Sequence, residues 1–327
     1  MSARVPVGVI GVGALGRHHA RHFSGNPEAE LVGIHDSSAE RAAEIANQLG
    51  CPAFQDLDLL LAKVKGVSIA TPTPFHHEVG VRALERSVAV LMEKPIAASA
   101  TQADDLIARA ERRGVPLQVG QIERFNRAIR AAEPVLDHPR YIECERLAPF
   151  SVRGSDVSVI LDLMVHDLDL VLHLTGAAGA TDLRATGGAL LSPHIDIANA
   201  RLELAGGAVA VVTASRLSRE RVRRVRIYQD NGYLSLDLST GTAEFLRLRN
   251  GWRPGAVAAS VDDVVERVAL TAPEADALGL ETSYFIRAIR GEQTPGVTGA
   301  EGRAALVLAR AVEEAVARAP LAPVAAG

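Results

Sequence analysis

The sequence predicts an α/β fold: an N-terminal Rossmann domain, with a doubly wound parallel sheet, followed by an α+β domain with an open, mostly antiparallel sheet. Residues 1–121 alternate short β-rich runs with helical runs, which is the pattern of repeated βα units. Residues 122–327 instead begin with a helix that carries a polar stripe and continue with long runs of alternating polarity. We therefore expect two domains, 1–121 and 122–327.

The expected elements follow from periodicity and from turn residues. Strands are predicted at 5–11, 30–36, 66–71, 88–93 and 115–120, separated by helical patterns at 39–50, 76–87 and 99–114 that mostly end at Gly or Ser. In the second part the dipeptide Asn231-Gly232 indicates a hairpin, because Asn-Gly favours tight turns between antiparallel strands. Two helical patterns, at 274–291 and 299–319, close the chain.

Composition excludes several classes of function. The 327 residues are 48% hydrophobic and 23% charged, as in ordinary globular proteins. No apolar run reaches the roughly 18 residues of a membrane span, and the N-terminus lacks a signal-peptide layout, so we expect a cytoplasmic protein without a membrane partner. A net charge of −4 gives no basis for binding nucleic acid. The cysteines, Cys51 and Cys144, indicate neither a disulfide framework nor a zinc site.

A glycine-rich loop follows the first predicted strand. The loop Gly11-Val-Gly13-Ala14-Leu15-Gly16 precedes a helix that should begin near Ala14, so its backbone is suited to a dinucleotide pyrophosphate. Asp36 follows Gly16 by twenty residues, at the end of the second strand, where a carboxylate accepts ribose hydroxyls and repels a 2′-phosphate. The cofactor prediction is therefore NAD, with Arg41 nearby. The alternative is a glycine turn with Asp36 as a helix cap.

Two further segments lie at carboxyl ends of predicted parallel strands, where such sheets bind ligands. The strand at 66–71 leads into Thr71, Pro72, Thr73 and His76, and the strand at 88–93 ends at Glu93 and Lys94. Of 35 basic residues only three are lysines, so Lys94 invites a chemical reason. An amine can exchange a proton, whereas guanidinium stays charged. A lysine that merely ends a strand is the alternative.

The segment LDLMVHDLDLVLHL at 161–174 carries four polar groups on one predicted helix face. At roughly 100° per residue, Asp162, His166, Asp169 and His173 fall within about 60° of one another. Buried carboxylates and imidazoles are costly unless they are paired or face a cavity. The stripe therefore predicts a site, with a structural Asp169–His173 pair, a buried hydrogen-bond network or a metal as alternatives. We expect no metal here or at His18 and His22, which are four residues apart on another helix.

Together, the loop Gly11 to Gly16, the segments TPTPFH and MEKP, and Asp162-x-x-x-His166 resemble the Gfo/Idh/MocA oxidoreductase family over nearly the whole chain. The resemblance implies NAD(P)-dependent oxidation of a sugar or polyol, with Lys94, Asp162 and His166 around the reacting carbon. It also implies a cis peptide before Pro95 and a homodimer or homotetramer formed through the open sheet. Lys94 and His166 would share the hydroxyl proton, and Asp162 would orient the imidazole or hold a substrate hydroxyl.

The substrate is suggested by two stretches. GQIERFNRAI at 120–129 and GSDVSVILDLMVHDLDL are similar to the branch of the family that oxidises the 3-hydroxyl of UDP-N-acetylglucosamine, although that branch often has His and Pro where this chain has Gln121 and Arg127. Further substrate-binding candidates are Arg124, Asn126, Arg153 and Arg216. The alternatives are an inositol or free-sugar dehydrogenase and a non-catalytic dinucleotide-binding regulator.

Overall fold

The computed structural model describes residues 3–151, 157–253, 260–319 and 321, and the chain forms two compact units. Unit 1 comprises residues 1–125 and 275–306, and unit 2 comprises residues 126–274 and 307–327. The first division, after Phe125, lies four residues beyond the expected boundary. The return of residues 275–306 to unit 1 differs from the continuous second domain expected from the sequence.

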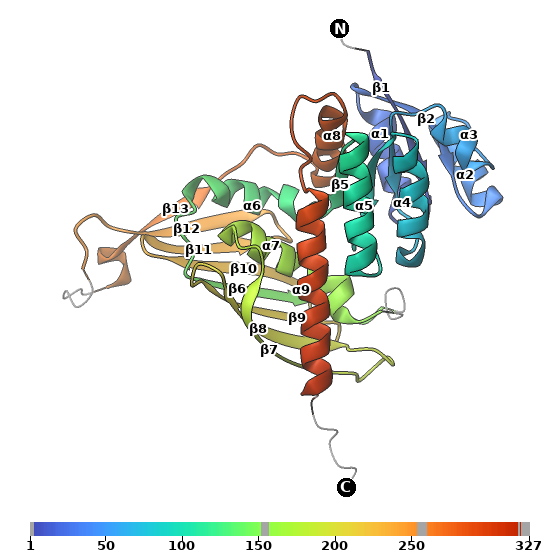
Figure 1. The fold of residues 1–327 in the computed structure, drawn as a ribbon. Coiled ribbons are helices and arrows are strands. Elements are labelled where there is room, and N and C mark those ends of the chain that lie inside the picture. Colours follow the sequence, from blue (N-terminus) through green and yellow to red (C-terminus); the bar gives the residue numbers. More distant parts are fainter. Residues whose placement is uncertain (1–2, 152–156, 254–259, 320, 322–327) are drawn as a thin grey trace. The chain divides into compact units, whose positions relative to one another are not determined.

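Unit 1 contains the predicted doubly wound sheet. Its five strands are parallel and lie in the order β2-β1-β3-β4-β5. The strands are β1 (Val5–Ile10), β2 (Ala29–His35), β3 (Gly66–Ile69), β4 (Ala89–Glu93) and β5 (Leu117–Gly120). The helices are α1 (Gly16–Gly25), α2 (Ala39–Leu49), α3 (Leu57–Leu61), α4 (His76–Glu85), α5 (Ala100–Arg113) and α8 (Ala277–Ile289). Two of these helices, α4 and α5, lie side by side (Figure 1). All five strand predictions are confirmed, and the short helix α3 is an addition to them.

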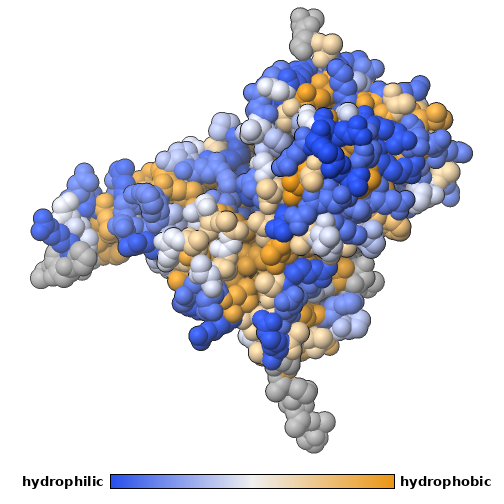
Figure 2. All heavy atoms as spheres, in the orientation of Figure 1, coloured by the Kyte–Doolittle hydropathy of each residue, from blue (hydrophilic) through white to orange (hydrophobic). Residues whose placement is uncertain are grey.

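Local sequence signals explain where these helices begin and end. Ser38 and Ser99 cap α2 and α5, because each hydroxyl accepts a hydrogen bond from a backbone N–H in the first turn. Both helices end at a glycine in the left-handed conformation, Gly50 and Gly114, where a side chain would be strained. On the face drawn in Figure 2, hydrophilic residues gather over α4 and α5. Every residue of β3, β4 and β5 is buried, as expected for strands in a sheet that is covered on both faces.

Helix α8 belongs to unit 1 because its apolar face completes that unit's core. Phe285 is fully buried and its ring centroid lies 6.3 Å from that of Phe23 in α1. A Cβ at Gly66, at the start of β3, would lie 2.5 Å from Ile289 Cδ1, so this glycine allows a close approach of helix and strand. Periodicity predicts the helix but carries no information about which core it joins.

Unit 2 is built on an eight-stranded sheet with the order β13-β12-β11-β10-β6-β9-β8-β7. The strands are β6 (Tyr141–Leu147), β7 (Ala180–Gly188), β8 (Ile197–Leu204), β9 (Val209–Ser215), β10 (Val222–Gln229), β11 (Gly232–Asp237), β12 (Thr242–Leu248) and β13 (Val265–Leu270). The pairing is antiparallel except between β6 and β9, which confirms the predicted mostly antiparallel sheet. The Asn231-Gly232 hairpin joins β10 to β11 as expected. Strands β6, β7 and β13 are additions to the strands that the sequence predicts.

The two faces of this sheet differ. On one face, alternate residues of β6, β8 and β10 are buried, among them Ile142, Cys144 and Val225. Helix α6 (Arg127–Ala132) packs against β11 and β12, and α7 (Val165–Thr175) packs against β6 and β9. The opposite face is only partly buried and carries tyrosines, arginines and glutamates. Its tyrosines, Tyr141, Tyr228 and Tyr233, contact one another through their rings.

The polar-striped segment is not a regular α-helix. Residues Ile160–Met164 form a π-helical turn that continues directly into α7. A turn of this kind shifts Asp162 from the helix face that α-helical spacing predicts, because its hydrogen bonds run from i to i+5. Helix α9 (Gly299–Arg318) closes the described fold, and short 3₁₀ segments cover Thr73–Phe75, Ile122–Phe125, Glu133–Val135 and Val261–Asp263. Among the described helices, none has the length and apolar character needed to cross a bilayer.

Truncation of Phe285 tests the role of α8 in unit 1. We expect Phe285→Ala to lower the free energy of unfolding by about 3–5 kcal/mol, because it removes a large, fully buried ring from the core. Chemical denaturation followed by circular dichroism measures the change. The control Leu59→Ala removes a side chain that is 58% exposed and should change stability by less than about 0.5 kcal/mol. Equal effects of the two substitutions would contradict the packing described.

Candidate functional site

The glycine-rich loop of unit 1 has the close contacts that a dinucleotide-binding turn requires. Gly11 has φ +83°, and a Cβ there would lie 2.9 Å from the backbone of Ala70 and Thr71. A Cβ at Gly16 would lie 1.7 Å from the Gly11 carbonyl oxygen, so only glycine fits where α1 begins. By contrast, a Cβ at Gly13 would meet nothing within 4 Å. The loop is therefore packed on its inner side and open at Gly13, which fits a pyrophosphate approaching the backbone.

The same loop offers the start of a helix to an anion. Helix α1 has Leu15 at its N-cap position, and no side chain caps it. Ala14 and Leu15 are both exposed, and the first turn contains no acidic residue that would compete with a phosphate. Positive potential at a helix N-terminus favours phosphate groups. Helix α1 begins two residues later than the predicted start near Ala14.

Asp36 is the buried carboxylate at the end of β2. It accepts hydrogen bonds from the backbone N–H of Val12, at 2.8 Å, and of Ser38, at 2.8 Å. Arg41 donates to both carboxylate oxygens, at 3.1 Å and 2.7 Å. Burial alone would raise the pKa of Asp36, but the hydrogen bonds from Arg41, Ser38 and Val12 outweigh it and lower the pKa. The carboxylate is therefore ionised at neutral pH and tied to the glycine loop.

The carboxyl ends of β3 and β4 are joined by His76. Its Nδ1 lies 2.9 Å from the Pro95 carbonyl oxygen and its Nε2 lies 2.8 Å from the Thr71 carbonyl oxygen. Burial lowers the pKa of His76, although the two carbonyls act in the opposite direction. The imidazole thus links the Thr71–Thr73 and Lys94–Pro95 segments. In the first of these segments, the buried hydroxyl of Thr71 has no hydrogen-bond partner within the described part of the chain, which fits a position where a polar cofactor group would bind.

Lys94 follows β4 and is half-buried, and its peptide bond to Pro95 is cis, as the resemblance implies. The preceding Glu93 is buried and accepts a hydrogen bond from the Lys94 backbone N–H at 3.2 Å. Glu93 also lies near His19 and Glu281. One imidazole nitrogen of His19 and one carboxylate oxygen of each glutamate lie within 4.8 Å of one another. His18 and His22, the pair with helical metal-ligand spacing, are not part of this group; His22 instead lies 3.3 Å from Asp276. The absence of a metal stays a prediction.

In unit 2, the two catalytic candidates lie in consecutive turns. Asp162 lies in the π-helical turn and His166 in the first turn of α7, and both side chains are half-buried. The neighbouring Asp167 is buried and forms a bidentate ion pair with Arg146 of β6, with both distances 2.8 Å. Such planar pairs are rigid and geometrically specific. The pair therefore fixes the first turn of α7 on the sheet.

A pocket within unit 2 lies beside this turn. It is lined by Asp162, Leu163, four arginines and a short stretch of backbone after β6; the arginines are Arg146, Arg216, Arg221 and Arg223. Arg223 pairs across the strands with Arg146, so both side chains leave the same face of the sheet. Arg216 is buried, donates to the Val157 carbonyl oxygen at 2.7 Å and lies 3.7 Å from Asp196. The pocket combines a carboxylate with an excess of positive charge, which fits an anionic ligand.

Other predicted substrate-binding residues have structural contacts. Arg124 is buried and lies 3.0 Å from Glu301, and Asn126 caps α6 while donating to the Leu238 carbonyl oxygen at 2.9 Å. His173 lies 3.0 Å from Glu133, and Asp169 is buried. Arg153 lies outside the described residues. The structure thus brings Asp162 and Arg216 together in one pocket, while Arg124 pairs with the Glu301 carboxylate and Asn126 holds backbone groups.

Sequence reasoning missed several residues of these sites. Arg146 could have been found, because YIECERL alternates and Arg146 falls on the apolar side of the strand. Arg221 and Arg223 lie in an arginine-rich stretch, RLSRERVRRVR at 216–226, but only the strand register shows that Arg223 faces the pocket and Arg224 the opposite side. Glu281 gave no signal, since an isolated acid in an amphipathic helix is usually solvent-exposed.

Two family models match the chain. Residues 5–121 match the oxidoreductase family with an NAD-binding Rossmann fold, named GFO_IDH_MocA, and residues 136–235 match the GFO/IDH/MocA C-terminal domain. A UDP-N-acetylglucosamine 3-dehydrogenase from Acidithiobacillus ferrooxidans is 41% identical over 310 residues, covering 94% of this chain and 96% of the relative. An inositol 2-dehydrogenase from Rhizobium meliloti is 25% identical over 335 residues, covering 96% of this chain and 97% of the relative.

Solved structures agree with this. A structure of the Acidithiobacillus ferrooxidans UDP-N-acetylglucosamine 3-dehydrogenase superposes with a TM-score of 0.88 at 40% identity, covering 96% of this chain and 98% of that chain. An Agrobacterium radiobacter oxidoreductase shares the fold with a TM-score of 0.83 at 18% identity, covering 96% and 97% of the two chains. The glycine loop with its buried acid, the lysine after β4 and the two matched domains lead to one conclusion: the chain belongs to the Gfo/Idh/MocA family of NAD-binding oxidoreductases.

Proposed function

We propose that this enzyme oxidises the 3-hydroxyl of UDP-N-acetylglucosamine to the 3-keto sugar with NAD as oxidant. The observation that carries the proposal is the 41% identity to a UDP-N-acetylglucosamine 3-dehydrogenase along 94% of the chain. The arginine-lined pocket beside Asp162 supports it, because a nucleotide diphosphate needs cationic partners and a free polyol does not. The inositol 2-dehydrogenases, at 25% identity, support a free polyol as the second candidate.

The chemistry assigned to the chain is removal of the hydroxyl proton. As the O–H bond breaks, the carbonyl forms and the hydrogen on the same carbon leaves with its electron pair. Bound NAD supplies the hydride acceptor. We assign the proton to Lys94 and His166, because an amine and an imidazole can both exchange a proton with a hydroxyl. Asp162, in the turn before His166, orients the imidazole or holds a sugar hydroxyl.

The cofactor preference is assigned to Asp36. Its ionised carboxylate would accept ribose hydroxyls and repel the 2′-phosphate of NADP. Arg41 is the cation within reach of a phosphate, but both of its hydrogen bonds go to Asp36. The remaining cofactor contacts in the proposal are the glycine loop, Thr71, Pro72, Thr73 and the segment around Glu93 and Lys94, with His76 joining the last two groups.

The pocket arginines are assigned to the diphosphate. Arg146 holds Asp167, and we propose that the other arginines of the pocket lining, Arg216, Arg221 and Arg223, meet the phosphate oxygens. A homodimer or homotetramer formed through the open sheet, and a cytoplasmic location, remain predictions within this proposal.

Comparison of substrates tests the proposal directly. With NAD present, UDP-N-acetylglucosamine should give a far higher kcat/KM than UDP-N-acetylglucosaminuronate, inositols or glucose, measured by the absorbance of the reduced cofactor. Oxidation of free polyols alone would favour the second candidate. Binding of NAD without oxidation of any of these compounds would instead favour a non-catalytic regulator.

Lys94→Met tests the proton transfer. We expect kcat to fall by about 10²-fold or more, the usual contribution of general acid–base catalysis, and by a much larger factor than any rise in the dissociation constant of NAD. Steady-state kinetics and calorimetric titration with NAD measure the two quantities. Lys65→Met, at an exposed lysine in the same unit, is the matched control and should keep its turnover. Undiminished turnover in Lys94→Met would remove this assignment.

Asp36→Asn tests the cofactor preference. The amide keeps an oxygen for the Val12 N–H but removes the negative charge, so the ratio of kcat/KM for NADP to that for NAD should rise about tenfold or more. Like charges brought together cost several kcal/mol, and 1.4 kcal/mol corresponds to a factor of ten. Thermal melts of both proteins show whether the loop remains folded. A wild-type enzyme that prefers NADP would contradict the role of Asp36.

Arg223→Ala tests the phosphate pocket. Loss of one charge-assisted contact should lower kcat/KM for UDP-N-acetylglucosamine by about 10- to 100-fold, mainly through KM. The matched control is Arg224→Ala, because the neighbouring side chain leaves the opposite face of β10 and lies 3.8 Å from Glu145. Kinetics of both variants should therefore differ. Equal losses, or no loss in Arg223→Ala, would show that the diphosphate binds elsewhere.

A further inference from the structure

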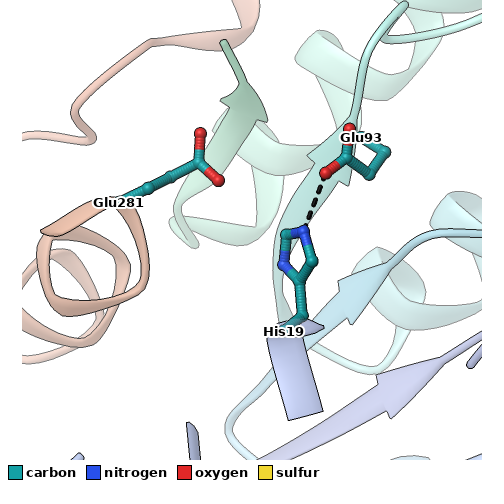
Figure 3. Close-up of side chains that lie close together, drawn as sticks. All are labelled: His19, Glu93 and Glu281. Atoms are coloured by element: carbon teal, nitrogen blue, oxygen red, sulfur yellow. Dashed lines mark hydrogen bonds and ion pairs between the residues drawn. The ribbon is translucent and has the colours of Figure 1, made fainter. Parts of the chain in front are cut away.

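Three buried ionisable side chains of unit 1 lie close together, and one of them directly precedes Lys94 in the chain. They come from three separate elements: His19 from α1, Glu93 from the end of β4 and Glu281 from α8 (Figure 3). Their exposed fractions are 1%, 9% and 0%. Burial of three such groups together is costly, so their protonation states must be matched to one another.

His19 and Glu93 form the fixed part of this triad. His19 Nε2 lies 2.7 Å from a Glu93 carboxylate oxygen, and His19 Nδ1 lies 3.0 Å from the Ser68 hydroxyl, which holds the plane of the ring. The second Glu93 oxygen accepts the Lys94 backbone N–H. A Cβ at Gly120 would lie 3.2 Å from the Glu93 carboxyl carbon, so the carboxylate lies against a residue with no side chain. Contacts from α1, from the backbone after β4 and from β5 thus determine where Glu93 lies.

Glu281 is the unexplained member. Its carboxyl group points toward His19 and Glu93 in Figure 3, yet neither of its oxygens has a hydrogen-bond partner among the described residues. Burial, and then repulsion by Glu93, raise the pKa of Glu281 well above its usual range. For Glu93, burial acts in the same direction, but the hydrogen bond and charge of His19, together with the interactions with Lys94, outweigh it and lower the pKa. The two carboxyl groups are therefore driven to opposite protonation states.

We propose that His19, Glu93 and Glu281 form a buried triad that positions Lys94, with Glu93 ionised and Glu281 held as the neutral acid. The proposal rests on the role of Lys94 in the proposed function. The Glu93 carboxylate accepts the Lys94 backbone N–H and so fixes the backbone at Lys94. His19 links Glu93 to α1, the helix that begins at the dinucleotide loop. A neutral Glu281 fills the space beside the His19–Glu93 pair without adding a second negative charge. These are positioning residues, because none is assigned a contact with the reacting atoms.

Other polar and charged side chains lie on elements near Glu281. The 3₁₀ segment Ile122–Phe125, which also packs on α8, contains Glu123 and Arg124, and Arg124 lies 3.0 Å from Glu301. From β5, the Gln118 amide donates to the Glu281 backbone carbonyl oxygen at 3.0 Å. Among these groups, Glu93 is the one whose charge acts on the pKa of Glu281.

Glu281→Gln gives a test that needs no substrate. An acid whose pKa is raised by folding contributes stability below its unfolded pKa and loses that contribution as pH rises toward the folded value. An amide mimics the neutral acid at every pH. The variant should therefore gain stability relative to wild type as pH rises from about 5 to about 8, seen as a growing difference in Tm. A difference in Tm that stays constant with pH would overturn the neutral-acid assignment.

Kinetics test the positioning role. In Glu93→Gln, kcat should fall at least about tenfold, and by a larger factor than any rise in the KM for NAD, because a misplaced Lys94 affects proton transfer more than it affects the cofactor contact of this segment. Glu281→Gln should keep most of the kcat that Glu281→Leu loses, since only the amide reproduces the polar shape of the acid. Equal losses in Glu281→Gln and Glu281→Leu would overturn the proposal.

Metal analysis tests whether a metal ion binds to the same three residues. An imidazole and two carboxylates are also ligands for Zn²⁺ or Mn²⁺. Elemental analysis of the purified protein should show less than a tenth of a metal ion per chain, and EDTA should leave the Tm unchanged. One bound metal per chain, lost with EDTA together with stability, would replace the neutral acid by a cation site. If no sugar is oxidised, the Tm series still decides the protonation of Glu281, so the two proposals fail separately.

Discussion

The cofactor end of this protein depends on one contact between backbones. The carbonyl of Gly11 lies where a side chain at position 16 would be, and Gly11 itself touches the chain after β3. This close packing brings the start of α1 to the mouth of the parallel sheet. It also places His19, one turn into the helix, against the end of β4. A larger residue at either glycine would displace the phosphate loop and the groups behind Lys94 together.

Unit 2 contains a mostly apolar helix, α7, that carries buried polar groups. The bidentate pair of Arg146 and Asp167 satisfies two buried charges and fixes α7 on the sheet. The turn before it departs from α-helical geometry, as π-turns often do at functional sites. Asp162 is thereby presented to the arginine pocket rather than to the apolar core. The rigid ion pair thus adjoins an irregular turn, and that turn carries Asp162, which is proposed to orient His166 or to hold a sugar hydroxyl.

Sequence predicted the features that depend on local spacing. The glycine loop, Asp36 and the position of Lys94 after a parallel strand follow from short-range patterns, and the structure places each where the βα order requires. Features that depend on distant packing were not predictable. Periodicity identifies α8 as a helix but not as part of unit 1, and it gives Glu281 no reason to be buried. The π-turn was missed because the same residues also fit a regular helix.

The central position of β6 has a consequence for how unit 2 forms. The strand pairs with β9 on one side and β10 on the other, both more than sixty residues later in the chain. Hairpins such as β8–β9 and β10–β11 need only short loops to close, whereas β6 must wait for both. During synthesis, its two edges stay open until β10 has emerged, and an open edge invites pairing with other chains. Co-translational aggregation of this protein should therefore depend on the length of chain made before β10.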